Sequence, residues 1–443
     1  MFKTLKNAWS IPEMRQKLLF TLFILILYRM GAAVKLPFVK ADALDSLESI
    51  MAGGSIFAYL NLLSGDAFAK TTLFALSISP YITASIVMQL LSIAIPALER
   101  LSKSGEEGQK KITQITRIVT VALAFLTAFG YYMFLKQNNL LTSTGNGVFG
   151  GFVIVFCYAA GASLIMWLAE KINEKGIGNG ISIILFANII ATMVPQLYSI
   201  VASAVSINII GGFSFAADAW QLVFVELLLF GSLAMITFVV YITNSERRLP
   251  VQYAKKVVGR KMYGGQSTNL PIKLNMSGVM PIIFANSIVA LPSTIALIFG
   301  IDTTGKGFWA KFLGLFNYDS WLYVILFFIL IILFSYFYIL ISFNPVEVSN
   351  NLKKNGGFIP GIRPGKPTSD YITRVLNRIT LIGALFLGII AVVPLIINIV
   401  SNSSYGSLAF GGSSLLIVVG VIIETTREIE AQMTMRHYKG FLD

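Results

Sequence analysis

Residues that could perform enzymatic or redox chemistry are nearly missing from this sequence. Its one histidine, His437, lies in the polar C-terminal tail, and its one cysteine, Cys157, lies in an apolar run typical of a packing residue. A single histidine gives no basis for a histidine-based metal or acid–base site, and a single cysteine cannot form an intrachain disulfide. No GxxxxGK[ST] stretch, which would cradle nucleotide phosphates, occurs. The sequence therefore predicts a protein that is not an enzyme and that uses no cofactor or metal.

The elements that must position any functional residue are membrane helices. Of the 443 residues, 56% are hydrophobic and only 12% are charged, whereas a soluble domain has about 25% charged residues. A chain this apolar cannot cover its surface with polar groups, so lipid must be its main solvent. Apolar runs long enough to cross a bilayer predict an all-α membrane protein with about ten transmembrane helices. These runs lie near residues 18–34, 71–95, 118–135, 150–169, 177–201, 219–242, 275–299, 321–343, 379–399 and 408–423.

The distribution of lysine and arginine predicts the orientation of these helices. With the N-terminus in the cytoplasm, 27 of the 34 basic residues fall in cytoplasmic segments and 6 fall in exterior segments. This bias indicates a multi-pass protein of the cell membrane with both termini in the cytoplasm.

Ten spans divide evenly into an N-terminal half, residues 1–205, and a C-terminal half, residues 206–443. A half with an odd number of spans inverts the half that follows it, and inverted-repeat membrane proteins place their pathway at the interface between the halves. The span count therefore predicts two inverted five-helix halves with a pathway between them.

Two ionisable residues fall inside the predicted spans. Arg29 lies close enough to the exterior to snorkel to the surface, which we expect in preference to a pathway role. Glu226 lies well inside the sixth span, where a functional role and plain snorkelling or neutral packing are equally supported. A proton- or sodium-coupled carrier should contain more such groups, so the sequence disfavours a small-solute secondary transporter.

One exterior segment, residues 56–63, is apolar but too short to cross a bilayer. Its length suits a re-entrant half-helix that is surrounded by protein or by a water-filled cavity. An amphipathic helix lying on the outer surface fits the same residues equally well. The residues alone leave both interpretations open.

Two predicted cytoplasmic loops, residues 244–274 and 344–370, are long and basic for connections between spans. Their lysines and arginines, set among prolines and glycines, suggest a docking surface for an anionic partner such as ribosomal RNA or an acidic protein. The alternative is that the loops only fix topology and touch anionic lipid headgroups. Topology needs few positive charges, so the length of the loops favours docking.

Several stretches, in order along the chain, resemble the SecY family, the pore subunit of the bacterial general protein-export (Sec) translocase. They begin at residues 79, 174, 247, 259, 344 and 411 and read SPYITASIVMQLL, EKGIGNGISI, RRLPVQYAKK, GRKMYGGQSTNLPIKLNMSGVMPIIFA, NPVEVSNNLKKNGGFIPGIRPGKPT and GGSSLLIVVGV. The resemblance covers nearly the whole chain. It departs from the common pattern at KLPFVKA, after the first span, and at LNLLSGD, residues 60–66.

The resemblance implies a central hourglass pore between the two halves, narrowed at mid-membrane by a ring of aliphatic side chains. Such a ring excludes water and ions by dewetting and yields to a passing chain. Within the ring, the pairs 78/82 and 181/185 are spaced i,i+4, so each pair shares one helix face. Carried over by motif, the ring consists of Ile78, Ile82, Ile181, Leu185, Ile283 and Ile417.

The resemblance also implies that the re-entrant segment, about residues 54–66, is a short plug helix that closes the exterior side of the pore. A lateral gate would open between the second and third spans and the seventh and eighth, with Gln89 and Asn286 as gate contacts. For Asn286, ordinary interhelical hydrogen bonding is the stronger explanation. The plug residues would be Leu60, Asn61, Leu62, Leu63, Ser64 and Gly65.

The same resemblance implies the partners. The SecA motor ATPase or a translating ribosome would dock on the basic loops and supply the work, and small subunits resembling SecE and SecG would bind in the membrane. Signal peptides, nascent chains and anionic lipids would also contact the chain. The docking residues would be Arg247, Arg248, Lys255, Lys256, Arg260, Lys261, Lys353, Lys354 and Arg363.

Other functional classes fit less well. An intramembrane enzyme would need a His/Glu/Asp or Ser/Lys constellation in the spans, and none occurs. Within the family, an accessory Sec channel dedicated to a few substrates is an alternative that the sequence leaves open. The glycines of the GIGNGIS stretch, residues 176–182, are expected to cap and bend the start of the fifth span.

Overall fold

The computed structural model describes residues 2–40, 61, 63–204, 206–208, 212–214, 219–253, 256–258, 261–263, 267–299, 320–400 and 411–439. Helices dominate these residues. They are α1 (Phe2–Ser10), α2 (Pro12–Ala33), α5 (Ser79–Ala94), α6 (Pro96–Lys103), α7 (Glu106–Gln137), α8 (Val148–Lys175), α9 (Gly180–Ala204), α10 (Ala219–Asn244), α11 (Met280–Phe299), α13 (Trp321–Ser342), α14 (Pro345–Lys354), α15 (Lys366–Val400) and α16 (Gly411–Lys439). The strands are β1 (Ser206–Asn208), β2 (Gly212–Ser214), β3 (Glu246–Tyr253), β4 (Lys256–Val258), β5 (Lys261–Tyr263), β6 (Ser267–Lys273) and β7 (Gly357–Phe358).

Each predicted span overlaps a helix of at least 16 residues: α2, α5, α7, α8, α9, α10, α11, α13, α15 and α16. In the described part of the chain, five helices are long and apolar enough to cross a membrane, or six if the bent pair α5 and α6 forms one span. The all-α membrane fold is thus confirmed, and the count of ten spans stays a prediction.

The second predicted span differs most from the structure. Residues 71–78 form turns, and helix α5 begins only at Ser79, where Pro80 occupies the first turn. Proline is tolerated there because the first turn lacks intrahelical partners for its N–H groups. The chain then bends by 105° between α5 and α6. Ile95 at the bend is extended because Pro96 follows it.

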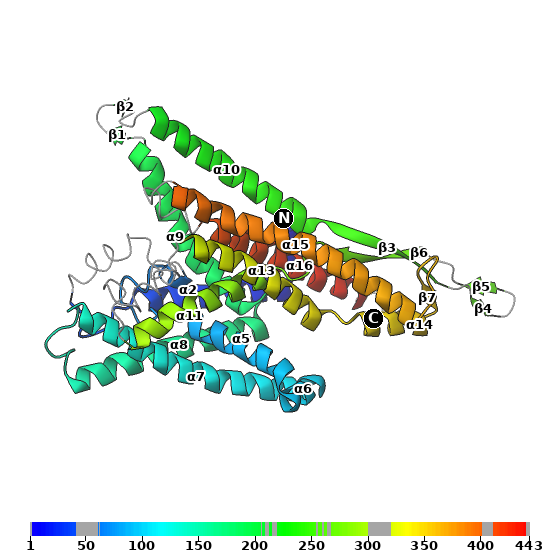
Figure 1. Cartoon of the computed structure of the whole chain (residues 1–443), viewed down its shortest axis with the longest axis horizontal. Coiled ribbons are helices and arrows are strands. Elements are labelled where there is room, and N and C mark those ends of the chain that lie inside the picture. Colours follow the sequence, from blue (N-terminus) through cyan, green and yellow to red (C-terminus); the bar gives the residue numbers. More distant parts are fainter. Residues whose placement is uncertain are drawn as a thin grey trace.

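The long helices run roughly along the length of the molecule in Figure 1, and α6, α14 and the strands β3, β6 and β7 lie toward one end. These elements come from the segments that the charge pattern predicts to be cytoplasmic. The strands β1 and β2, at the joint between the predicted halves, lie at the opposite end (Figure 1). The segments predicted to be cytoplasmic and the joint between the predicted halves thus lie at opposite ends of the molecule, and their orientation in a membrane stays a prediction.

One small sheet joins the two predicted docking loops. Strand β3 pairs antiparallel with β6, in the register Glu246↔Lys273 to Gln252↔Ser267, and with β7 through Gln252↔Phe358. Leu249 and Val251 of β3 turn inward into an apolar cluster with the start of α15. The two loops, about 100 residues apart in sequence, thus form a single folded surface rather than two separate connections.

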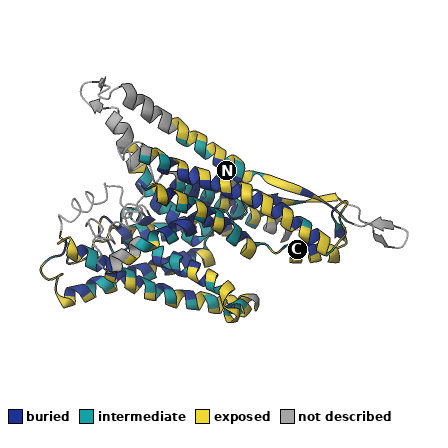
Figure 2. Cartoon of the chain, viewed as in Figure 1, coloured by how far each residue is buried: buried dark blue, intermediate teal, exposed yellow. Residues whose placement is uncertain are grey.

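The main apolar core draws on both predicted halves. Helix α11 packs against α13 on one side and against α5 and α7 on the other. Figure 2 shows buried residues on the inward faces of the helices and exposed residues on their outer faces. The outward side chains of α2 and α10 include Phe23, Met30, Leu233 and Tyr241, each more than half exposed. Large apolar side chains on an outer face are expected where lipid or a membrane partner covers the helix.

Candidate functional site

The six predicted ring residues all belong to one apolar cluster. Ile78, Ile82, Leu185, Ile283 and Ile417 are buried within it, and Ile181 is half-buried against it. They reach the cluster from four elements: the start of α5, α9, α11 and α16. Side chains from both predicted halves therefore lie in one apolar cluster, where full burial of each aliphatic side chain contributes about 1.5–3 kcal/mol.

The bend before α9 positions Ile181 and Leu185. Gly178 has a φ of +79°, a left-handed conformation that favours glycine. The side chain of Asn179 accepts a hydrogen bond from the backbone N–H of Ile181 at 3.0 Å and so caps the helix. Gly180 approaches the carbonyl of Ala169 in α8 so closely that a Cβ atom would overlap it. The predicted capping and bending by this glycine-rich stretch are confirmed.

The predicted plug lies only partly within the described residues. Leu60 and Leu62 are outside them, as is most of the segment 54–66. Leu63 is 6% exposed and belongs to the same apolar cluster as the ring, and Ser64 is buried beside it. Gly65 has a φ of +66° and Asn61 binds Asp66 through their side chains at 3.0 Å. The end of this segment is thus folded inward, against the core.

The snorkelling prediction for Arg29 is wrong. Its guanidinium donates hydrogen bonds to the carbonyl of Gly65 at 3.3 Å and to the carbonyl of Ala187, in α9, at 3.2 Å. These two charge-assisted hydrogen bonds offset part of the cost of taking the guanidinium out of water. Sequence could not show this, since both acceptors are main-chain atoms. Glu226 lies in α10, but its side chain is outside the described residues.

The two predicted gate contacts lie on helices that pack together, α5 and α11, but no hydrogen bond joins them among the described residues. Gln89 donates to Ser85 of its own helix at 3.4 Å. Asn286 is buried, and its side-chain nitrogen has no partner in the described part of the chain. A buried N–H group without a partner weakens the packing of α11 here, because the cost of its desolvation is left uncompensated.

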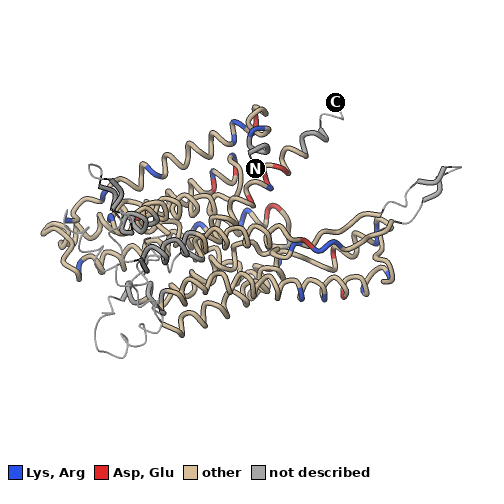
Figure 3. The backbone as a smooth tube through the Cα atoms, turned by 90° about the horizontal axis from the view of Figure 1, so that it is seen from above, with Lys and Arg blue, Asp and Glu red and all other residues tan. Residues whose placement is uncertain are grey.

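The described docking residues lie at one end of the molecule. Figure 3 shows the lysines and arginines of the β3–β6 ribbon beside those of the neighbouring helices at that end. Arg247 is exposed, whereas Arg248 is paired with Glu246 at 2.8 Å. Lys353 and Lys354 are exposed in the last turn of α14, where their positive charges interact favourably with the negative end of the helix dipole. Lys255 and Arg260 lie outside the described residues, as do the side chains of Lys256 and Lys261.

Arg363 lies in a turn that is fixed from both sides. The flanking residues Gly361 and Gly365 have φ values of +82° and +105°. Thr368 donates its hydroxyl to the carbonyl of Arg363 at 2.8 Å, and Ser349 of α14 donates to the carbonyl of Gly365 at 2.7 Å. The backbone is therefore held while the Arg363 side chain is exposed to solvent.

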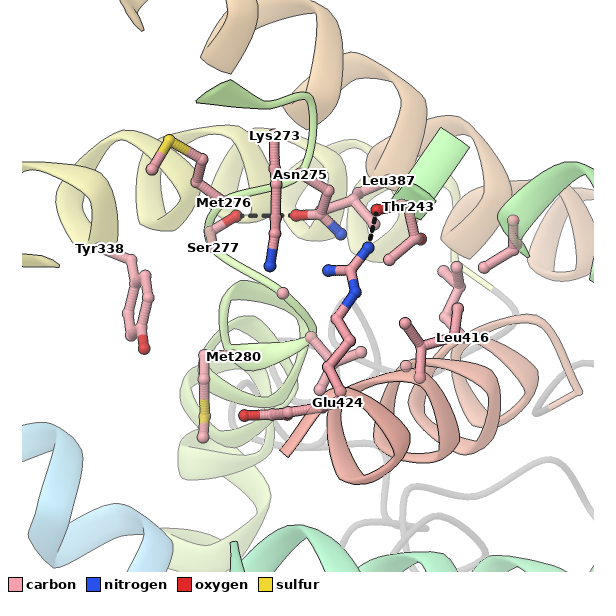
Figure 4. Close-up of a pocket in the computed structure, with 16 residues that line it drawn as sticks. Thr243, Lys273, Asn275, Met276, Ser277, Met280, Tyr338, Leu387, Leu416 and Glu424 are labelled. Atoms are coloured by element: carbon pink, nitrogen blue, oxygen red, sulfur yellow. Dashed lines mark hydrogen bonds between the residues drawn. The ribbon is translucent and has the colours of Figure 1, made fainter. Parts of the chain in front are cut away.

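A cavity of about 220 Å³ at the start of α11 was not foreseen from the sequence. Figure 4 shows Lys273, from β6, and Glu424, from α16, extending toward it. Arg427, which also lines the cavity, donates to the carbonyl of Thr243 at 3.0 Å. Partial burial, and secondarily Arg427, lower the pKa of Lys273 from its usual value.

Comparisons with a family model and with known proteins give the same family along the chain. The SecY family model matches residues 72–426. The protein translocase subunit SecY of Mycobacterium tuberculosis (strain ATCC 25618 / H37Rv) is 43% identical over 456 residues, and that of Streptomyces coelicolor is 42% identical over 451. Both alignments cover 100% of this chain and 100% of the relative.

Solved structures share the fold. One, described as the structure of a protein conducting channel, has a TM-score of 0.62 and 18% identity and covers 95% of this chain and 92% of its own. Another is Sec61 in the canine ribosome–channel complex from the endoplasmic reticulum, with a TM-score of 0.59, 17% identity and the same coverage. At these identities the likeness concerns the fold alone.

Proposed function

Because the chain belongs to the SecY family, we propose that it is the channel-forming subunit of a Sec protein translocase. It passes unfolded secretory proteins across the cell membrane and is not an enzyme. The observation that carries this function is that Ile78, Ile283 and Ile417, from three elements of the two predicted halves, are buried in one apolar cluster. An export channel needs a seal that separates two aqueous phases and still opens to a chain of any sequence. Aliphatic side chains suit that need because they impose no hydrogen-bonding preference.

We propose that the other parts act around this seal. The segment 54–66 is the plug on the exterior side, and the buried Leu63 is its described contact with the core. The lateral gate lies where α11 packs against α5 and α7. The side-chain nitrogen of Asn286, which has no partner in the described part of the chain, makes that contact less costly to separate than a fully satisfied one. Transmembrane segments leave through it into lipid because apolar side chains are more stable there than in an aqueous pore.

We propose that a cytoplasmic partner supplies the work and docks on the sheet β6–β3–β7 with α14 and the Arg363 turn. A single folded surface with exposed basic groups suits an anionic ligand, either ribosomal RNA or an acidic face of the SecA motor. A similar fold occurs in Sec61 within a ribosome–channel complex, which supports the ribosome as one partner. SecE-like and SecG-like subunits would cover part of the outer apolar faces, with both termini of this chain in the cytoplasm.

Reconstitution tests the proposed function. Liposomes that contain the chain with its small subunits, SecA and ATP should protect an added secretory precursor from external protease. The control omits this chain and keeps every other component. Equal protection in the two preparations would contradict the proposed function. An uptake of small solutes without protein import would support the transporter class instead.

A further inference from the structure

Three polar side chains converge on the inner end of the predicted plug. Asn188 of α9 donates to the carbonyl of Leu63 at 2.7 Å, and Ser77 donates to the same carbonyl at 2.9 Å. Asn188 also donates to Ser77 at 3.3 Å. Arg29 of α2 binds the carbonyl of Gly65, two residues further on. Residues 63–65 are therefore held through main-chain atoms from three separate elements.

These contacts lie in the interior of the molecule, where they are strongest. Asn188 is 0% exposed and Ser77 is 1% exposed. Among the described residues no carboxylate lies within ion-pair distance of Arg29, and its hydrogen bonds go to two carbonyls, of Gly65 and Ala187. A partly buried guanidinium that loses one of its acceptors is left poorly compensated, so the group favours the docked position of residues 63–65.

Gly65 is the position that lets these groups close on the segment. A Cβ atom there would lie 2.9 Å from the side-chain oxygen of Asn188 and 3.0 Å from a guanidinium nitrogen of Arg29. That oxygen of Asn188 is buried without a partner in the described part of the chain. The φ of +66° at Gly65 favours glycine, and a larger residue would push the side chains of Asn188 and Arg29 away from their present positions.

The segment that follows is strained. Asp66, Thr71 and Ser77 have φ values of +68°, +46° and +51°, which are uncommon for residues with side chains and most unusual for β-branched threonine. Strained backbone persists only where surrounding contacts hold it, and it is released when they break. The polar contacts therefore hold residues 63–65 in place, while the strained backbone of residues 66–77 favours their release.

We propose that Arg29, Ser77 and Asn188 form a latch on residues 63–65 and that their strength sets how readily the idle channel opens. Breaking the latch frees the end of the plug and releases the strain in residues 66–77. The latch works through main-chain carbonyls, so it is insensitive to the unusual LNLLSGD sequence of this segment. This inference rests on the proposed function, because it gives the segment its role as a plug.

Labelling of a buried position measures the latch directly. Leu63→Cys is introduced in a Cys157→Ser background, and a membrane-impermeant thiosulfonate is added to the outside of spheroplasts. In idle channels the labelling should be slow, because Leu63 is buried. Arg29→Met and Asn188→Leu should each raise the labelling rate about tenfold or more, and Ser77→Ala should raise it less. Arg29→Lys should partly restore protection, since lysine keeps the charge and hydrogen-bond donors.

Two matched controls separate the latch from general effects. Thr192→Val removes a buried hydroxyl from α9 that binds only carbonyls of its own helix, and it should leave labelling unchanged. Lys40→Met removes an exposed positive charge that binds the carbonyl of Asn139, away from the plug, and should also change nothing.

Defined outcomes would overturn the latch. The first is a labelling rate equal to that of the parent in both Arg29→Met and Asn188→Leu when these variants reach normal membrane levels. The second is a labelling rate that rises in Lys40→Met as much as in those two variants. If those two variants do not accumulate, Ser77→Ala, which loses a single oxygen atom, decides by the same criterion. If the parent channel imports precursors and the variants label as slowly as the parent, the latch alone is rejected. A parent that imports nothing would reject the proposed function.

Discussion

Reversing the charge of Arg363 should abolish motor-driven export without affecting insertion of the channel. The Arg363→Glu variant replaces an exposed cation in a fixed turn with an anion that repels an anionic partner. Loss of a charge-assisted contact costs about 1.5–3 kcal/mol, or roughly a 10- to 100-fold weaker complex, and the repulsion adds to this. SecA-dependent import into inverted membrane vesicles should fall at least that far. Orientation should stay normal because the other cytoplasmic positive charges remain.

Lys366→Glu is the matched control for this prediction. Lys366 is exposed in the first turn of α15, three residues from Arg363, and a glutamate is favourable at a helix N-terminus. If the loop served only to fix topology, Arg363→Glu and Lys366→Glu would lower SecA-dependent import by the same small amount. Normal import by Arg363→Glu, or its insertion in the wrong orientation, would contradict docking at this turn.

Polar replacement in the ring should make the idle channel leak. Ile417 is 2% exposed in the cluster that joins both predicted halves. In Ile417→Asn, the apolar burial that favours the closed state is lost, which amounts to about 1.5–3 kcal/mol. The closed-to-open ratio should therefore fall roughly 10- to 100-fold. Ion conductance in planar bilayers should rise, and precursors with defective signal sequences should be exported.

Two substitutions control for general damage to the core. Ile417→Leu keeps the side chain aliphatic and should not leak. Val392→Asn introduces the same polar group into the same cluster from α15, at a position outside the ring. It should lower thermal stability without raising conductance. Equal conductance in Ile417→Asn and the parent channel, or equal leaks in Ile417→Asn and Val392→Asn, would remove Ile417 from the ring.

Much of the helical fold was predictable because long apolar runs carry a strong signal. The structure departs from the sequence prediction where backbone conformation decides. Residues 71–78 are apolar enough to extend the second span, yet Thr71 and Ser77 adopt positive φ values and the helix starts after them. Apolar composition indicates that a segment prefers lipid or a buried core to water. It does not show where tertiary contacts force the backbone into a turn instead of a helix.

The sheet β6–β3–β7 was missed although part of its signal was present. Leu249 and Val251 are spaced two residues apart, and their neighbours are exposed, as in a half-buried strand. Pro250 in β3 and Pro271 in β6 argued against strands, because proline is confined to edges and interruptions of sheets. The contacts of Arg29 were likewise hidden, since main-chain acceptors leave no mark in a sequence.

The most direct test of the central claim is to ask which residues a chain touches during export. A photoreactive amino acid is placed in turn at Ile78, Ile283 and Ile417, and at Ile389 on the exposed face of α15 as a control. A secretory precursor with a folded C-terminal domain is then arrested midway by SecA and ATP. We expect crosslinks from all three ring positions to the same stretch of precursor, and none from Ile389. Crosslinks absent from the ring, or as frequent at Ile389, would contradict a central pore between the two halves.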